Sequence, residues 1–117
     1  MNIIKRAGPH FLESETGMIL VGTRVGSQPA QFPPTEYLLD DQHATDVVLG
    51  PTGRLYSCTV VHPGKDKAPY GLAMVDFGEV RAFGRLLLDG KPPALDSLVR
   101  VVSFTLPGGT PDYAFQE

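Results

Sequence analysis

The stretch Gly53-Arg54-Leu55-Tyr56-Ser57-Cys58-Thr59-Val60-Val61-His62 decides how this chain is expected to fold. It is rich in Val, Leu, Tyr and Thr, which suit a half-buried strand, and its apolar residues form no stripe at helical spacing. After a break that contains Pro, Gly and Lys, a second segment of the same kind covers residues 70–76. The two segments therefore predict neighbouring antiparallel strands.

The rest of the chain repeats this pattern of short segments between breaks. It contains 13 Gly and 11 Pro in 117 residues, well above the usual combined share of roughly 12%. Strands are predicted at residues 18–25, 47–49, 55–62, 70–76, 79–88, 98–106 and 112–115. The segment 35–45 is the one candidate for a short helix, with Thr35 available as its cap.

These segments predict an all-β protein with two parts. About 70 residues of short strands suggest a small closed barrel, because closure removes exposed strand edges. We expect residues 46–117 to form a five- to six-stranded OB-like barrel and residues 1–45 to form an N-terminal arm. An SH3-like barrel or a sandwich is left open at this point, because the number of strands does not determine their topology.

Composition excludes several classes of protein. Hydrophobic residues make up 42% and charged residues 20% of the chain, and the mean hydropathy is -0.04, a globular balance. No apolar run reaches the roughly 18 residues of a membrane span, and the first residues do not read as a secretory signal. We therefore expect a cytoplasmic protein that does not contact membranes.

The charge distribution argues against a nucleic-acid partner. The net charge is -3, and residues 1–50 hold three basic and six acidic side chains. Proteins that bind nucleic acids draw much of their affinity from basic residues that neutralise phosphates. Neither half of the chain carries the required excess of positive charge.

Four blocks of sequence resemble the acyl-CoA-associated OB-fold family, whose members join a rubredoxin-like zinc ribbon to an OB barrel. The blocks are Gly53-Arg54-Leu55-Tyr56-Ser57-Cys58-Thr59-Val60-Val61-His62, Pro69 to Asp76, Val80 to Leu86 and Leu98 to Phe104. The likeness covers roughly residues 18–117, and the first block is its most specific part. It implies an accessory subunit whose partner is a thiolase-like or hydratase-like enzyme, with coenzyme A or acyl-CoA as a ligand.

The zinc-ribbon half departs from that family's pattern. When Arg24 and the Phe32-Pro33-Pro34 turn are laid on the family's frame, the four cysteine positions are occupied by Val25, Gln28, Leu38 and Asp41. A structural zinc site needs four N or S ligands, and these residues offer none. We expect a metal-free relic of the ribbon, held by a Val25–Leu38 contact and by docking on the barrel or a partner.

The sequence contains little evidence for a catalytic site. Cys58 and His62 have the chemistry of a nucleophile and base, but four positions on a strand separate them by about 13 Å. We expect Cys58 to be a buried strand residue, since free cysteine is among the most buried residue types. A small-molecule enzyme that uses Cys58 or His62 stays as an alternative, and otherwise no catalytic residue is assigned.

Two surfaces are candidates for binding. The connection from His62 to Pro69 presents His62, Lys65 and Lys67, which could contact a phosphate of coenzyme A. The Phe32-Pro33-Pro34 turn, together with Tyr37, could anchor a partner protein. Each of these segments is also an ordinary surface turn in the simplest interpretation.

The aromatic residues test a second alternative, an OB module that binds single-stranded nucleic acid. Such modules stack bases on exposed aromatic rings in a basic groove. The aromatic residues here alternate with apolar positions and lack clustered basic residues, so most are expected in the core. They are Tyr56, Tyr70, Phe77, Phe83, Phe104, Tyr113 and Phe115.

Together these observations predict a non-catalytic accessory or scaffold subunit that binds an acyl-CoA-handling enzyme. No tightly bound cofactor and no zinc are expected. The acyl group, the identity of the partner, the oligomeric state and the conformation of the arm are left undetermined by the sequence.

Overall fold

The computed structural model describes residues 3–5, 8–39 and 42–117, which form strands and no helix. Within these ranges there is accordingly no helix suited to crossing a membrane. The strands are β1 (Ile3–Lys5), β2 (Phe11–Ser14), β3 (Gly17–Val25), β4 (Tyr37–Leu39), β5 (Ala44–Leu49), β6 (Thr52–Val61), β7 (Tyr70–Asp76), β8 (Arg81–Leu86), β9 (Leu98–Thr105) and β10 (Pro111–Gln116).

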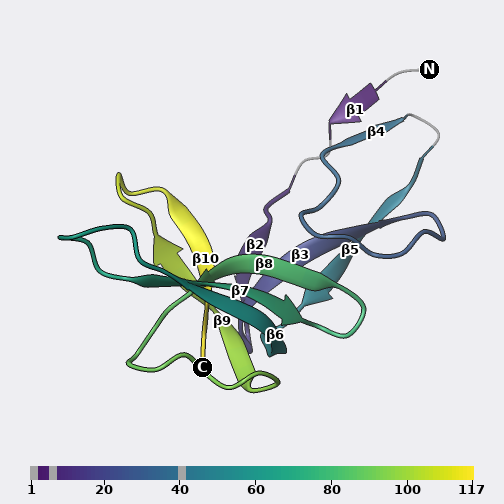
Figure 1. The fold of residues 1–117 in the computed structure, drawn as a ribbon. Coiled ribbons are helices and arrows are strands. Elements are labelled where there is room, and N and C mark those ends of the chain that lie inside the picture. Colours follow the sequence, from purple (N-terminus) through teal and green to yellow (C-terminus); the bar gives the residue numbers. More distant parts are fainter. Residues whose placement is uncertain (1–2, 6–7, 40–41) are drawn as a thin grey trace.

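The last five strands close into a barrel in the order β10-β8-β7-β6-β9 (Figure 1). Antiparallel pairing joins β6 to β7, β7 to β8, β9 to β10 and β6 to β9. The barrel closes through a parallel contact in which Phe115 of β10 lies opposite Leu86 of β8. This is a small OB-like barrel, and the expected all-β fold is confirmed.

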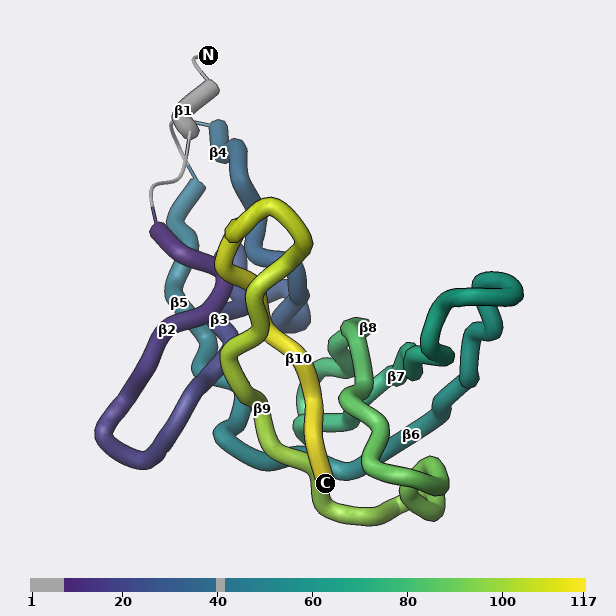
Figure 2. Tube along the Cα trace, turned by 90° about the vertical axis from the view of Figure 1, so that its left-hand side faces the viewer, coloured from purple at the N-terminus to yellow at the C-terminus, as the bar shows by residue number. Residues whose placement is uncertain are grey.

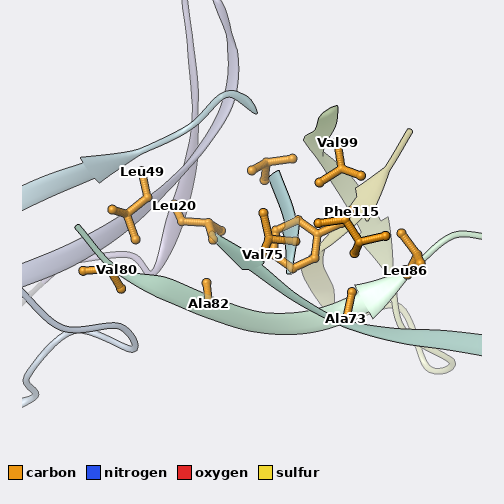
Figure 3. Close-up of a cluster of buried hydrophobic side chains, with 11 residues drawn as sticks. Leu20, Leu49, Ala73, Val75, Val80, Ala82, Leu86, Val99 and Phe115 are labelled. Atoms are coloured by element: carbon orange, nitrogen blue, oxygen red, sulfur yellow. The ribbon is translucent and has the colours of Figure 1, made fainter. Parts of the chain in front are cut away.

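The barrel interior is filled by the inward-facing side chains of alternating positions. Along β7, buried Gly71, Ala73 and Val75 alternate with half-buried residues that face outward. Phe115 is fully buried at the centre of the resulting cluster (Figure 3). Burying one such aromatic side chain contributes about 1.5–3 kcal/mol to folding.

The arm packs against the barrel and shares its core. A three-stranded sheet, β2-β3-β5, joins β6 through Gly50 and Pro51, and a separate β1–β4 pair lies at the far end from the barrel (Figure 1). Leu20 of β3 and Leu49 of β5 belong to the same apolar cluster as the barrel side chains (Figure 3). The molecule is therefore elongated, 52 × 31 × 26 Å, but built on one continuous core.

Most strands lie where the sequence predicts them, and one predicted element is wrong. The segment 35–45 does not form a helix, because Tyr37–Leu39 pairs with Ile3–Lys5 as a strand. Strands β1, β2 and β4 were not anticipated. The predicted division between residues 45 and 46 falls inside β5, Ala44–Leu49, and it stays a prediction.

Candidate functional site

Three of the four positions expected to correspond to zinc ligands meet at one cavity in the arm. Val25 ends β3, Gln28 follows in the next turn, and Leu38 lies in β4. All three line a cavity of about 560 Å³. The other lining residues are Pro29, Ala30, Gln31, Thr35, Tyr37 and Gln42. The fourth position, Asp41, lies outside the described residues.

This cavity does not suit a structural zinc ion. The side chains of Val25 and Leu38 offer no donor atom, and Gln28 offers a neutral amide in place of a thiolate, which zinc prefers. In the described ranges, no three His, Cys, Asp or Glu side chains are grouped closely enough to hold a metal. The sequence alignment placed Val25, Gln28 and Leu38 around one site, and in the structure all three line the same cavity.

Hydrogen bonds organise the arm around this cavity. The Thr23 side chain is fully buried, and its Oγ1 accepts a bond of 2.8 Å from the backbone N–H of Thr35. Thr23 and Gln31 also exchange two backbone bonds, of 3.0 and 2.8 Å. Arg24 forms an ion pair with Glu79, which comes just before β8. These contacts tie the cavity wall to β3 and to the barrel.

The Phe32-Pro33-Pro34 turn, which was expected to contact a partner protein, is only partly exposed. Pro34 is buried, and Phe32 packs edge-on against Tyr113 with 5.7 Å between ring centroids. Pro33 is exposed, and Tyr37 is 56% exposed beside the arm cavity. Of the four residues proposed as a partner contact, Pro33 and Tyr37 are therefore the ones available at the surface.

The loop between β6 and β7 projects from the barrel (Figure 2). His62, Lys65 and Lys67 are exposed in it. Among the described residues, their side chains have no hydrogen bond or ion pair. The structure thus leaves these three side chains accessible to a ligand without joining them into a pocket.

Cys58 and His62 lie apart on the barrel. Cys58 is half-buried on β6 opposite Ala73, while His62 is exposed just beyond the end of that strand. Their spacing along an extended chain, about 13 Å, is too long for a hydrogen bond. Cys58 lies on a strand as expected, but it is half-buried where a buried residue was expected.

The barrel carries an exposed face of aromatic and arginine side chains that sequence reasoning missed. Tyr56 is 50% and Phe83 55% exposed, so these two are exceptions to the expectation that most of the aromatic residues lie in the core. The Arg81 guanidinium lies 3.7 Å from the centre of the Tyr56 ring. Strict alternation along β8, in which Arg81 and Phe83 flank buried Ala82, is the signal that could have identified this face.

A second arginine on the same strand is held between two rings. The Arg85 guanidinium lies 4.5 Å from the Tyr70 ring centre and 5.0 Å from that of Phe104. Such contacts contribute about 0.5–2 kcal/mol each, depending on how far they are desolvated. They hold the arginine in one orientation on the outside of the barrel.

Tyr113 links this face to the arm. Its hydroxyl donates a hydrogen bond of 2.5 Å to the carbonyl of Phe83. Burial, with the Asp112 charge as a second cause, raises the pKa of Tyr113 to about 12. A cavity of about 330 Å³ lies where the arm meets the barrel, and its lining residues are Phe32, Pro33, Met74, Arg81, Phe83 and Tyr113.

Comparison with known proteins adds evidence about the fold. No protein-family model matches this chain, and no curated protein matches it. A solved structure described as "Ltp2-ChsH2(DUF35) aldolase" matches with a TM-score of 0.65 at 20% sequence identity. The alignment covers 84% of this chain and 84% of the other. The two chains share a fold. Because the coverage extends beyond the length of the barrel alone, the likeness includes part of the arm.

Proposed function

We propose that this protein is a non-catalytic accessory subunit that binds an acyl-CoA-handling enzyme of the thiolase-like or hydratase-like kind in the cytosol. The observation that carries the proposal is the shared architecture of arm and barrel with a chain of the Ltp2-ChsH2(DUF35) aldolase. That description joins two named proteins in one enzyme. The resemblance of the barrel sequence to the acyl-CoA-associated OB-fold family points in the same direction.

The proposed role does not depend on catalytic groups of this chain. Cys58, the candidate nucleophile, lies on β6, and His62, the candidate base, lies four positions further along in the loop after it. An accessory subunit instead needs surfaces that hold a partner or a ligand. The exposed aromatic and arginine side chains of the barrel provide residue types that are enriched at protein interfaces.

We further propose that the loop after β6 contacts the phosphates of coenzyme A. Lys65 and Lys67 are exposed and lack an ion-pair partner in the described part of the chain. Coenzyme A carries three phosphates, and charge-assisted hydrogen bonds to phosphate are among the stronger polar contacts of proteins. The intervening Asp66 reduces the local charge, so we expect weak binding in the absence of the partner.

Affinity purification of the tagged protein from its native cells tests the subunit role. We expect one thiolase-like or hydratase-like enzyme to be recovered in a constant molar ratio. Recovery of the protein alone under gentle, low-salt conditions would contradict the proposal.

Binding of coenzyme A to that complex tests the loop. The double variant Lys65→Glu/Lys67→Glu should weaken binding about tenfold, while Lys91→Glu, in another exposed loop, should leave it unchanged. Equal binding by the double variant and the native protein would remove the loop from the proposal.

A further inference from the structure

The outer face of β7 and β8 is a candidate binding surface with an unusual composition. Register pairs place Met74 opposite Phe83 and Asp76 opposite Arg81, all on the side of the sheet that faces away from the core. Tyr56 adds a further ring, because it lies on the outward side after buried Leu55. It is also the extra residue of a bulge between Leu55 and Ser57. We call Tyr56, Met74, Arg81, Phe83 and Arg85 the stacked face.

The arm converts one end of the stacked face into a socket. Phe32 and Pro33 come from the turn after β3 and close the cavity of about 330 Å³ against Met74 and Phe83. Phe83 is 55% exposed at its edge. An apolar socket of this size suits one aromatic or large aliphatic side chain, the usual anchor of a protein interface.

The charged side chains of the stacked face indicate whether its binding partner is acidic or basic. The stacked face holds two basic side chains, Arg81 and Arg85, although the chain as a whole carries a net charge of -3. The acidic side chains nearest to Arg81 along the chain are already in ion pairs, Asp76 with Arg81 and Glu79 with Arg24. Arg85 has no acidic partner among the described residues. The region therefore has spare positive charge to offer an acidic partner.

The aromatic stacks favour a protein partner over a nucleic acid. Single-stranded nucleic acids bind OB barrels by stacking bases on free ring faces. Here Arg81 covers a face of Tyr56, and Arg85 lies over Tyr70. A guanidinium stacked on a ring can still donate its edge N–H groups, and two parallel hydrogen bonds of this kind recognise a carboxylate.

We infer that the stacked face binds an acidic segment of a partner protein that inserts one aromatic or large aliphatic side chain beside Phe83 and sets a carboxylate on Arg85. This inference rests on the proposed function, because it names the chemistry by which the partner enzyme is recognised. It places the contact on the barrel, whereas the sequence placed it on the Phe32 turn and Tyr37. Phe32 and Pro33 contribute as the wall of the socket.

The test uses the methionine methyl groups of the full chain as NMR probes. Met74 lines the socket, and Met18 on β3 lies outside it and serves as the internal control. The main probe is a synthetic heptapeptide with one tryptophan between three aspartates on each side. We expect this peptide to shift the Met74 signal and leave the Met18 signal unchanged. Replacing its tryptophan by serine, or its aspartates by lysines, should abolish the shift.

Variants on and away from the stacked face test whether the peptide shifts the Met74 signal by binding there. Phe83→Ala and Arg85→Glu should each weaken peptide binding about tenfold. Leu95→Ala, at a residue 63% exposed elsewhere, and Lys91→Glu should leave binding unchanged. All four changes lie at partly or fully exposed positions, and equal melting temperatures will verify that the variants are folded.

Three results would overturn the inference. The first is a Met74 signal that no peptide shifts, and the second is a larger Met74 shift with a single-stranded thymidine oligonucleotide than with the peptide. The third is a Met74 shift that depends on protein concentration alone, which would indicate that a second copy of this chain binds the face. Because the peptide assay requires no enzyme, its failure is distinguishable from a failure of the affinity purification. Recovery of an enzyme with no peptide binding would retain the subunit role and move its contact elsewhere.

Discussion

The substitution Thr23→Val tests how the arm is held together. Valine keeps nearly the same shape, so the change creates no cavity, but it removes the hydroxyl that accepts the 2.8 Å bond from the Thr35 N–H. Leaving that donor unpaired in a partly buried site costs about 1–3 kcal/mol. At roughly 4 °C per kcal/mol for a domain of this size, the melting temperature should fall by about 4–12 °C.

Circular dichroism measures the melting temperature, and amide hydrogen exchange localises the effect. Exchange at Gln31 and Thr35 should accelerate more than exchange in β7, because these amides lie on the arm. Thr45→Val, at an exposed position of β5, is the matched control and should change the melting temperature by less than about 1 °C. A Thr23→Val protein as stable as the control would refute the view that this buried bond anchors the arm.

Three further predictions follow from the barrel and the arm. The folded-state pKa of Tyr113 is raised to about 12 from 10.0, so protonated Tyr113 contributes about 1 kcal/mol to stability after allowance for solvent screening. This contribution is complete below pH 10 and is lost as the pH rises through 12. Urea unfolding from pH 9 to 12 should show the fall in stability, and Tyr113→Phe should remove this pH dependence. In Gly84→Ala the new Cβ would lie 2.7 Å from Cε2 of Tyr113, so urea unfolding should show a loss of about 1–3 kcal/mol, and no loss would indicate that the ring moves freely. Introducing cysteine at all four ribbon positions should produce a protein that binds one zinc ion by elemental analysis and melts at a higher temperature, and a zinc content no higher than that of the native chain would show that the ribbon alignment is wrong. The four positions are Val25, Gln28, Leu38 and Asp41.

The sequence was sufficient to predict the barrel because its strands depend on local signals. Residues 70–76 alternate between inward and outward positions and are bounded by Pro69 and Gly78, and the strand Tyr70–Asp76 has the predicted bounds. The segment 35–45 lacked such a signal. Its strand Tyr37–Leu39 exists because it pairs with Ile3–Lys5, a partner more than 30 positions away that no local pattern reveals.

The candidate site was less predictable because it depends on irregularities and on distant contacts. Tyr56 lies outward in step with buried Leu55, but the bulge shifts the alternation of Ser57 and the following residues by one, and composition does not reveal such a shift. The socket beside Phe83 forms only when Phe32 and Pro33 of the arm reach the barrel. Three of the positions that the ribbon alignment grouped, Val25, Gln28 and Leu38, line one cavity, and the relation to a zinc ribbon stays a prediction.

The continuous core limits how genes encoding such a protein can be cut and recombined. Leu20 and Leu49 lie in the same apolar cluster as Val80 and Ala82 of the barrel. A gene fragment that begins after these arm residues would yield a barrel with exposed apolar surface, which is prone to aggregate or to be degraded. Recombination is therefore expected to transmit the coding region for both parts as a single heritable unit.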